Sequence, residues 1–187
     1  MSLYHLDRDP NKSRFEKKTM DFSADASTFE IKLSFLQPFE LASVTGLHTE
    51  STYDNAAEFG SAEYLMLHSH LCTNFERILP IAAMHNRTEI ISLLIKLGAR
   101  DLDHALYSAA NCDQPAAIQE LVRCGARDIK NALRDATRRG NLASIKVLVK
   151  LGATNFTNAI WEAQRHKQKS AETLLVGLQT VHSMRQV

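Results

Sequence analysis

The chain has 187 residues and a net charge of +1, and its 44% hydrophobic and 23% charged residues are ordinary for a globular protein. No run approaches the ~18 uninterrupted apolar residues of a membrane-spanning helix, and three cysteines without framework spacing favour free thiols in a reducing cytosol over a disulfide scaffold. The charge is uneven, since residues 1–76 carry a balance of −6 and residues 77–187 one of +7, which favours an anionic partner for the basic part unless the acidic part folds back on it.

Residues 1–51 are predicted to be an N-terminal arm and capping segment. Residues 1–28 are polar and charged without periodicity, which favours disorder or a loosely docked arm, and they lack the apolar core of a signal peptide. Apolar and polar residues then alternate over residues 28–36 with the period of a half-buried strand, although a short helix that ends near Pro38 stays open. We expect a cytoplasmic protein in which this segment covers the first face of the array that follows.

Residues 52–178 are predicted to be a tandem array with a 27-residue period. A Gly-Ala phrase recurs at that spacing, and an alanine lies sixteen residues ahead of each glycine, with one further alanine continuing the series. The glycines are Gly98, Gly125 and Gly152, and the alanines are Ala82, Ala109, Ala136 and Ala163. Such self-similarity is the signature of a solenoid, in which each unit buries its apolar face against its neighbours. The predicted units are 52–72 (degenerate), 73–100, 101–127, 128–154 and 155–178, with a tail at 179–187.

Each unit is predicted to hold two helices of about ten residues joined by a short polar turn. Asp101 is a typical N-cap, and Asp128 and Asn155 stand at the same place in later units. First helices are expected at 102–111, 129–138 and 156–165. Pro115 suits the first position of a second helix, and the closing glycine suits a left-handed C-cap. In the last unit Glu172 replaces an isoleucine, as expected where an outer face meets water. The fold class is therefore an all-α helix-turn-helix solenoid.

These residues resemble the ankyrin repeats over about residues 52–178. The shared pattern is Leu106 with Ala109-Ala110 three residues on, a polar turn, Ile118 with Leu121-Val122, and a closing Gly-Ala-x-Asp phrase at residues 125–128. The usual unit has about 33 residues. The missing residues lie between the closing phrase and the first helix, which would remove the projecting β-hairpin finger, and the Thr-Pro-Leu-His tetrapeptide is absent. Similar fingerless arrays occur in proteins of large DNA viruses and in secreted effectors of intracellular bacteria, so the resemblance also allows a pathogen effector in a host cytoplasm.

The resemblance implies a non-catalytic protein–protein interaction module that binds along its concave, first-helix face. The two residues after each Ala-Ala pair face that groove in the family, and a third column lies beneath the lost finger. Transferred position by position, the columns hold Met84, Asn111, Arg138 and Arg165; His85, Cys112, Arg139 and His166; and Pro80, Tyr107, Arg134 and Trp161. The predicted partner-binding residues are Tyr107, Asn111, Arg134, Arg138, Arg139, Trp161, Arg165 and His166. We expect a monomer that binds an acidic or acidic–aromatic protein segment, because Trp, Tyr and Arg dominate binding hot spots.

Other interpretations stay open at this point. Trp161 could pack against the C-terminal helix and leave the arginines as a solvated face, or residues 1–50 could occupy the groove as an autoinhibitory arm. The basic C-terminal repeats could bind nucleic acid or another polyanion, although the pI of 7.8 lies below that of typical nucleic-acid binders.

A small metal-dependent enzyme is the third alternative. The cluster His68-x-His70-x-Cys72 could hold a metal on a strand, but helical positions i and i+2 diverge by about 200°. A structural zinc site also needs four ligands, and no second pair stands at suitable spacing. No phosphate loop or nucleophile elbow occurs. We therefore expect no enzymatic activity, catalytic residue, metal or cofactor.

Overall fold

The computed structural model describes residues 40, 42, 46, 48–72 and 74–184. All regular elements in this part of the chain are helical, so the all-α prediction is confirmed for it. The chain divides into two units, residues 1–52 and residues 53–187. The predicted strand at residues 28–36 and nearly all of the predicted capping segment lie outside the described residues. None of the helices in the described ranges combines the length and apolar composition that crossing a bilayer requires.

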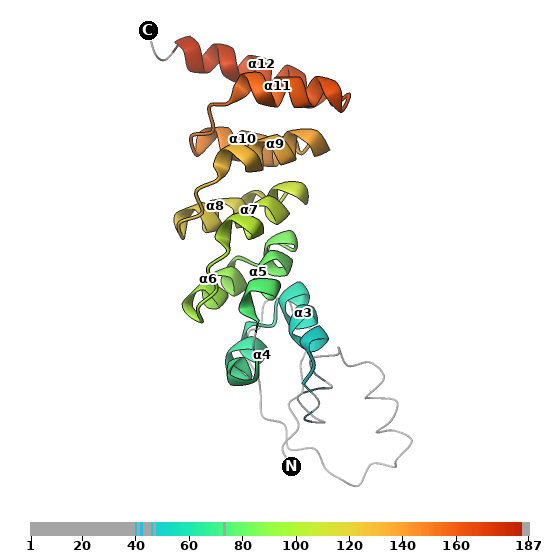
Figure 1. The fold of residues 1–187 in the computed structure, drawn as a ribbon, viewed down its shortest axis with the longest axis vertical. Coiled ribbons are helices and arrows are strands. Elements are labelled where there is room, and N and C mark those ends of the chain that lie inside the picture. The colour runs from blue at the N-terminus through green and yellow to red at the C-terminus, as the bar shows by residue number, and fades with distance from the viewer. Residues whose placement is uncertain (1–39, 41, 43–45, 47, 73, 185–187) are drawn as a thin grey trace, which may run out of the picture. The chain divides into compact units, whose positions relative to one another are not determined.

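The second unit consists of helix pairs arranged in layers (Figure 1). It contains most of α3 (Glu50–Phe59), then α4 (Ala62–Leu67) and a short 3₁₀ helix, η1 (Ser69–Leu71). Each of the next four layers pairs a first helix with a second helix: α5 (Phe75–Met84) with α6 (Thr88–Lys96), α7 (Leu102–Asn111) with α8 (Pro115–Arg123), α9 (Ile129–Arg139) with α10 (Leu142–Lys150), and α11 (Phe156–Arg165) with α12 (Lys169–Met184).

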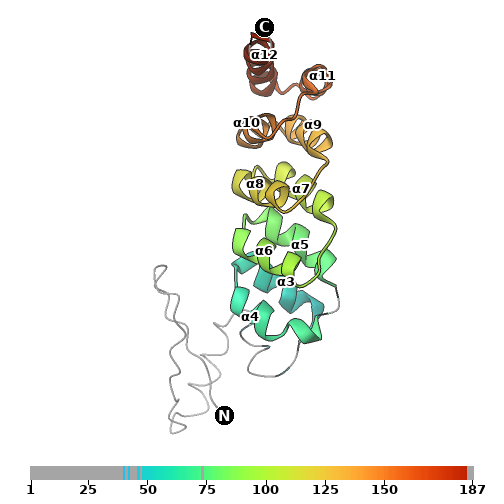
Figure 2. The ribbon, with the colours of Figure 1, turned by 90° about the vertical axis from the view of Figure 1, so that its left-hand side faces the viewer.

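The layers stack so that each helix contacts the corresponding helix of the next layer. First helices pack in the series α5, α7, α9 and α11, and second helices in the series α6, α8, α10 and α12. Figure 2 shows these as two parallel rows. The core lies between the rows and between the layers, and the recurring alanines Ala82, Ala109, Ala136 and Ala163 are all fully buried. A methyl-sized side chain at this position lets neighbouring first helices approach closely.

The second helices α6, α8 and α10 end in the same way. In α8, Gly125 has a φ of +113° and its N–H donates to the Val122 carbonyl (3.1 Å), while the Ala126 N–H donates to the Leu121 carbonyl (3.0 Å). These two bonds form a Schellman motif, which satisfies carbonyl groups that the helix end would leave unpaired. Gly98 and Gly152 repeat the motif in their layers. Glycine recurs here because a side chain at so positive a φ is strained.

The first helices also end at a left-handed residue in every layer. The residues are Asn86 (φ +58°), Asp113 (φ +54°), Gly140 (φ +77°) and Lys167 (φ +57°). Gly60 (φ +90°) ends α3 similarly. The sequence predicted only polar turns at these positions. The shared left-handed conformation is not visible in the sequence, because three of the four residues are not glycine and because Asn and Asp adopt this conformation at modest cost.

Side chains in these turns join one layer to the next. The Asn86 Oδ1 accepts a hydrogen bond from the Ala117 N–H (2.9 Å), and the Asp113 Oδ1 accepts one from the Ser144 N–H (2.8 Å). Both donors lie in the first turn of the second helix in the following layer, where backbone N–H groups lack helical partners. These two first-helix turns therefore each cap a second helix of the following layer. Gly140 cannot do this, because it has no side chain.

A second set of hydrogen bonds holds the loops that connect the layers. The Glu76 carboxylate accepts from the N–H groups of residues 100 and 101 (2.7 and 2.8 Å), and the Asp103 carboxylate accepts from those of residues 127 and 128 (2.8 and 3.0 Å). Each carboxylate lies in the first turn of a first helix and binds the loop that enters the next layer. The third layer carries Lys130 at this position, so the pattern stops there.

One predicted capping residue, Asn155, behaves differently from the sequence prediction. Asp101 and Asp128 cap their helices as expected, but the Asn155 side chain accepts no capping bond and its Nδ2 donates to the Lys130 carbonyl (3.2 Å). Because residue 130 offers no carboxylate to this loop, Asn155 supplies the link instead. Glu172, which was expected on a face that meets water, is half-buried and accepts a hydrogen bond from Gln164 (2.7 Å) at the surface.

Candidate functional site

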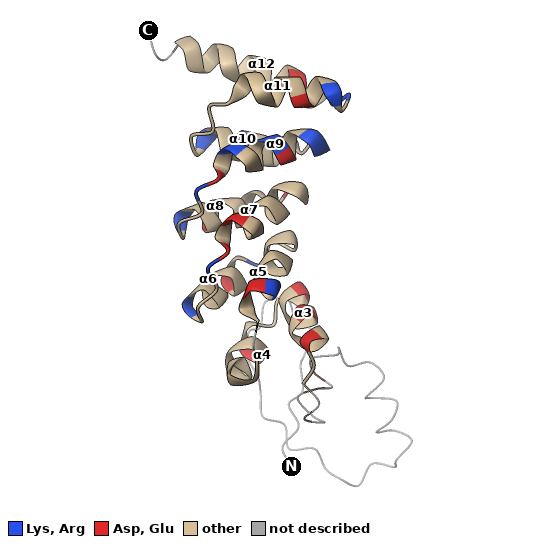
Figure 3. Ribbon diagram, viewed as in Figure 1, with Lys and Arg blue, Asp and Glu red and all other residues tan. Residues whose placement is uncertain are grey.

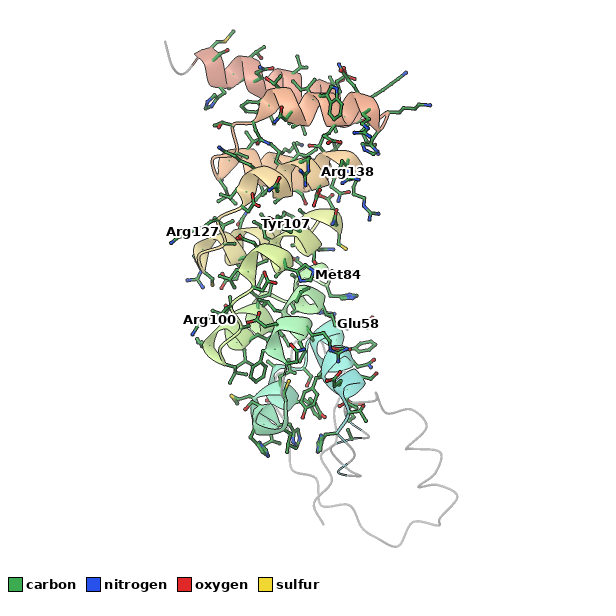
Figure 4. The ribbon with its side chains drawn as sticks, in the orientation of Figure 1. Glu58, Met84, Arg100, Tyr107, Arg127 and Arg138 are labelled. Atoms are coloured by element: carbon green, nitrogen blue, oxygen red, sulfur yellow. The ribbon has the colours of Figure 1, made fainter. Side chains whose placement is uncertain are left out.

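A polar hollow opens where three consecutive first helices end. Its volume is about 330 Å³, and its lining residues come from α7, α9 and the end of α11. We call it the hollow; it is lined by Asn111, Asp135, Arg138, Arg139 and His166. Figure 4 shows Arg138 at this edge of the layers, on the same side as Met84. Four of the eight predicted partner-binding residues therefore lie together.

The regular helix ends explain why these side chains gather. Asn111 is the last residue of α7, Arg138 and Arg139 close α9, and His166 is the C-cap of α11. The turns that follow all begin with a left-handed residue. Since α7, α9 and α11 pack side by side and end in register, residues at equivalent places project at one edge. Cations are also favourable near a helix C-terminus, because the last carbonyl groups give it partial negative charge.

Carboxylates lie among the basic groups of this edge. The Asp135 Oδ1 is 3.6 Å from the Arg134 Nε and 3.7 Å from an Arg138 guanidinium nitrogen, and the Glu162 Oε2 is 3.4 Å from the His166 Nε2. Figure 3 shows acidic residues next to the Lys and Arg at the ends of α9 and α11. The surface is therefore mixed in charge rather than uniformly basic, and Arg138 is already engaged.

Arg139 and Asn111 differ from Arg138 in this respect. Within the described part of the chain, Arg139 makes no ion pair and the Asn111 side chain makes no hydrogen bond. Arg139 is exposed and Asn111 is half-buried. A guanidinium group and a carboxamide are thus available to hydrogen-bond a ligand in the hollow.

Trp161 lies on α11 close in sequence to the hollow residue His166, and its side chain is 55% exposed. The Arg165 guanidinium carbon lies 5.1 Å from the centroid of its ring. This cation–π contact, of about 0.5–1 kcal/mol at an exposed site, orients both side chains. The indole therefore presents apolar surface to solvent, which distinguishes it from a packed core residue.

Tyr107 has a structural role instead. Its hydroxyl donates to the Asp128 Oδ2, and that carboxylate also accepts from Asn131 at the start of α9. Burial, followed by the bond to Asp128, raises the pKa of Tyr107 to about 12. The Tyr107 hydroxyl and then Asn131 hold the pKa of Asp128 below its usual value. Tyr107 thus connects α7 to the N-terminus of α9 and does not line the hollow.

His68, His70 and Cys72, which the sequence offered as an alternative metal cluster, lie in three different local structures. His68 is the C-cap of α4, His70 lies in η1 and Cys72 is in extended backbone, and the His68 ring packs 4.7 Å from that of Tyr64. In the described ranges no three His, Cys, Asp or Glu residues come together as a metal site would require. Burial raises the pKa of the Cys124 thiol, which makes it a weak nucleophile at neutral pH.

Asp135 is the hollow residue that sequence reasoning missed. A usable signal existed, because Asp135 stands three and four residues before Arg138 and Arg139, the spacing at which helical side chains meet. Asp135 belongs to none of the three groove columns, because it lies between the columns of Arg134 and Arg138. No protein-family model matches the chain, and a search of curated proteins finds no match either.

Proposed function

We propose that this chain is a non-catalytic binding protein, a solenoid of fingerless ankyrin-like repeats that holds a protein segment against its first-helix face. The observation that carries the proposal is the hollow. It brings Asn111, Arg138, Arg139 and His166 together at one edge, with the exposed Trp161 nearby on α11. Hydrogen-bond donors next to an exposed aromatic side chain are suited to binding a protein segment.

Regular layer geometry supports the repeat part of the proposal. The same two helix ends recur in successive layers, and so do the hydrogen bonds from one layer to the next. The loop that joins α6 to α7 is only a few residues long, and Glu76 holds two of its N–H groups. A loop this short leaves no room for a projecting hairpin, as the fingerless interpretation requires.

The charges of the hollow indicate the chemistry of the ligand. Arg139 has a guanidinium group free to form two parallel hydrogen bonds with a carboxylate. Asp135 needs hydrogen-bond donors from the ligand, because an approaching carboxylate would be repelled by it. An acidic peptide segment supplies a carboxylate for Arg139 from its side chains and hydrogen-bond donors for Asp135 from its backbone N–H groups. A nucleic acid would instead bring closely spaced phosphates next to Asp135 and Glu162, which disfavours the polyanion alternative.

Trp161 should supply most of the binding free energy. Exposed ion pairs contribute only about 0–1 kcal/mol each, whereas covering an aromatic side chain removes a large apolar surface from water. Arg139 should mainly steer the acidic segment and fix its position. We therefore expect a ligand that combines an acidic residue for Arg139 with an aromatic or aliphatic residue for Trp161.

The test uses the full chain as the target for selection from a random peptide library. Trp161 is the single tryptophan of the chain, so its fluorescence reports directly on this face. Selected peptides should be enriched in acidic and aromatic residues, and they should shift Trp161 emission to shorter wavelength and protect it from acrylamide. Trp161→Ala should mainly speed dissociation, and Arg139→Glu should mainly slow association, both measured by surface plasmon resonance.

Arg127→Glu is the matched control, because it makes the same charge change at the opposite edge of the layers (Figure 4). It should bind the selected peptides as the wild type does. Equal binding by the wild type and both site variants, or an unchanged Trp161 signal, would place the binding surface elsewhere. Tight binding of a single-stranded oligonucleotide that weakens steeply with salt and with Arg139→Glu would support the polyanion alternative instead.

A further inference from the structure

The last helix, α12, carries an outward face that nothing in the described chain covers. The face follows helical spacing along Thr173, Val176, Gly177, Thr180, Val181 and Met184, and all six residues are exposed. We call it the α12 stripe. Met184 is 78% exposed, and Val176 and Val181 are each close to half exposed. Residues 173–184 contain no Lys, Arg, Asp or Glu.

Comparison with the inner layers shows what is unusual about α12. In α6, α8 and α10 the place of Gly177 is taken by exposed basic residues, namely Lys96, Arg123 and Lys150. Each of those helices stops at a left-handed glycine soon afterwards, whereas α12 continues to Met184. The terminal helix is thus longer than the helices beneath it, and it carries no Lys, Arg, Asp or Glu from residue 173 to residue 184. A helix whose outer face only meets water needs neither this extra length nor a face without charged residues.

The extension of α12 is held firmly to the layer below its stripe. The His182 ring lies 5.6 Å from that of Phe156, which is almost fully buried at the start of α11. Leu175 and Ala171 face inward and are fully buried. Inward contacts at both ends fix the rotation of the helix, so the α12 stripe is presented to solvent as a continuous surface.

We propose that the α12 stripe is a self-association surface on which a second copy of this chain packs, with the two α12 helices antiparallel about a two-fold axis. An antiparallel pairing centred between Gly177 and Thr180 places Gly177 of each copy opposite Thr180 of the other. The missing side chain at Gly177 lets the helices approach closely there. Val176 and Val181 then flank the contact on its two sides.

The absence of charge from the α12 stripe makes the same stripe on a second copy a suitable partner for it. Most other exposed surfaces of the described chain carry Lys, Arg, Asp and Glu (Figure 3), and docking such a surface on the α12 stripe would remove charges from water without compensation. An exception is the run 64–72, which contains no charged residue and exposes Met66, Leu67 and Leu71. Pairing the stripe with that run would join copies head to tail, in a contact that does not close after two copies. The stripe paired with itself desolvates no charged group. The same patch on both copies is also what a two-fold interface requires.

The size of the stripe sets the expected affinity. Covering it on both copies would bury on the order of 1,000 Å² in total, which lies at the small end of specific interfaces. The dimer should therefore be weak and reversible. It departs from the monomer expected from the sequence, and it is independent of the proposed peptide binding, because the hollow belongs to the row of first helices.

Sedimentation velocity of the full chain tests the proposal. From ~10 µM to ~1 mM the wild type should shift from monomer toward dimer, as a weak interface requires. Thr180→Lys puts like charges in the centre of the contact and should weaken dimerisation by about tenfold or more. Gln179→Lys is the control, because Gln179 is exposed on the same helix but lies about 100° around it.

Circular dichroism melting curves show whether both variants keep the fold, which is expected because each replaces an exposed residue. A wild type that stays monomeric at the highest concentration overturns the proposal. So does equal weakening by Thr180→Lys and Gln179→Lys. A wild type that grows beyond the dimer into larger species would indicate head-to-tail stacking instead, since a two-fold contact closes after two copies.

Discussion

At the scale of single residues, Glu120 on the surface of α8 links this helix to α6. It lies on α8, at a column that holds Leu93 in the layer before and Val147 in the layer after. Its carboxylate accepts hydrogen bonds from Arg123 on the same helix and from the Ser92 hydroxyl on α6. These bonds, with Arg123 first, lower the pKa of Glu120 to about 2. A polar link between second helices thus replaces an aliphatic contact.

The first prediction concerns the pH dependence of this link. Because the folded-state pKa of Glu120 lies below its ordinary value of 4.5, its contribution to stability is complete above pH 4.5 and is lost as the pH falls toward about 2. Glu120→Gln should therefore be less stable than the wild type at pH 7 and should lose stability less steeply in the acid window. Urea unfolding at several pH values measures both.

Glu89→Gln, which changes the same charge at an exposed position of α6, controls for the general effect of removing a carboxylate. The Glu120 link would be unimportant if the two variants gave the same pH slope.

At the scale of elements, carboxylates near the start of the first helices hold each connecting loop against the next layer. Asp103 accepts from the N–H groups of residues 127 and 128, at 2.8 and 3.0 Å. These groups lie at the entrance to α9, where the chain has no helical partners for them. The carboxylate therefore matters more than the position, because Lys130 occupies the equivalent place in the next layer and its ammonium group cannot accept hydrogen bonds from N–H groups.

Asp103→Ala should lower the free energy of unfolding by about 1–3 kcal/mol, because two backbone donors lose a charged acceptor. Lys130→Ala alters the equivalent position one layer on and should change stability by no more than about 0.5 kcal/mol. Chemical denaturation at pH 7 compares them. Similar losses in the two variants would show that the Asp103 bonds contribute little.

At the scale of the whole molecule, the second unit is held by contacts between adjacent layers. The helices of each row contact the layers before and after them, and the caps from Asn86 and Asp113 also cross one boundary each. A single layer therefore lacks most of the partners that bury its apolar residues.

A fragment of residues 128–187 keeps α9 to α12 but loses every contact with α7 and α8, so it should unfold without a sharp transition. A fragment of residues 74–187 retains four layers and should unfold cooperatively, since about three repeats are needed for stability. Amide dispersion in NMR spectra and thermal melting distinguish them. A well-dispersed spectrum from the shorter fragment would contradict a stability that depends on neighbouring layers.

The sequence by itself determined the helices of the inner layers and the glycine ends of α6, α8 and α10, whereas α12 continues to Met184 through residues predicted as a tail. The predicted helices at 102–111 and 156–165 agree with α7 and α11, and α9 extends one residue past the predicted 138. Asp101 and Pro115 occupy the predicted cap and first-turn positions. These features follow from apolar periodicity and from interactions within a few residues, which a single sequence records directly.

Only the tertiary structure decided what the side chains at the candidate site do. Arg138 and Arg139 are neighbours in sequence, but Arg138 pairs with Asp135, whereas Arg139 makes no ion pair in the described chain. The Tyr107 hydroxyl is hydrogen-bonded to Asp128, and the Trp161 side chain is exposed. These outcomes depend on which side chains of adjacent layers meet, and residues in different layers are far apart along the chain. A repeat period places residues on a face, but packing between layers determines which of them are free to bind.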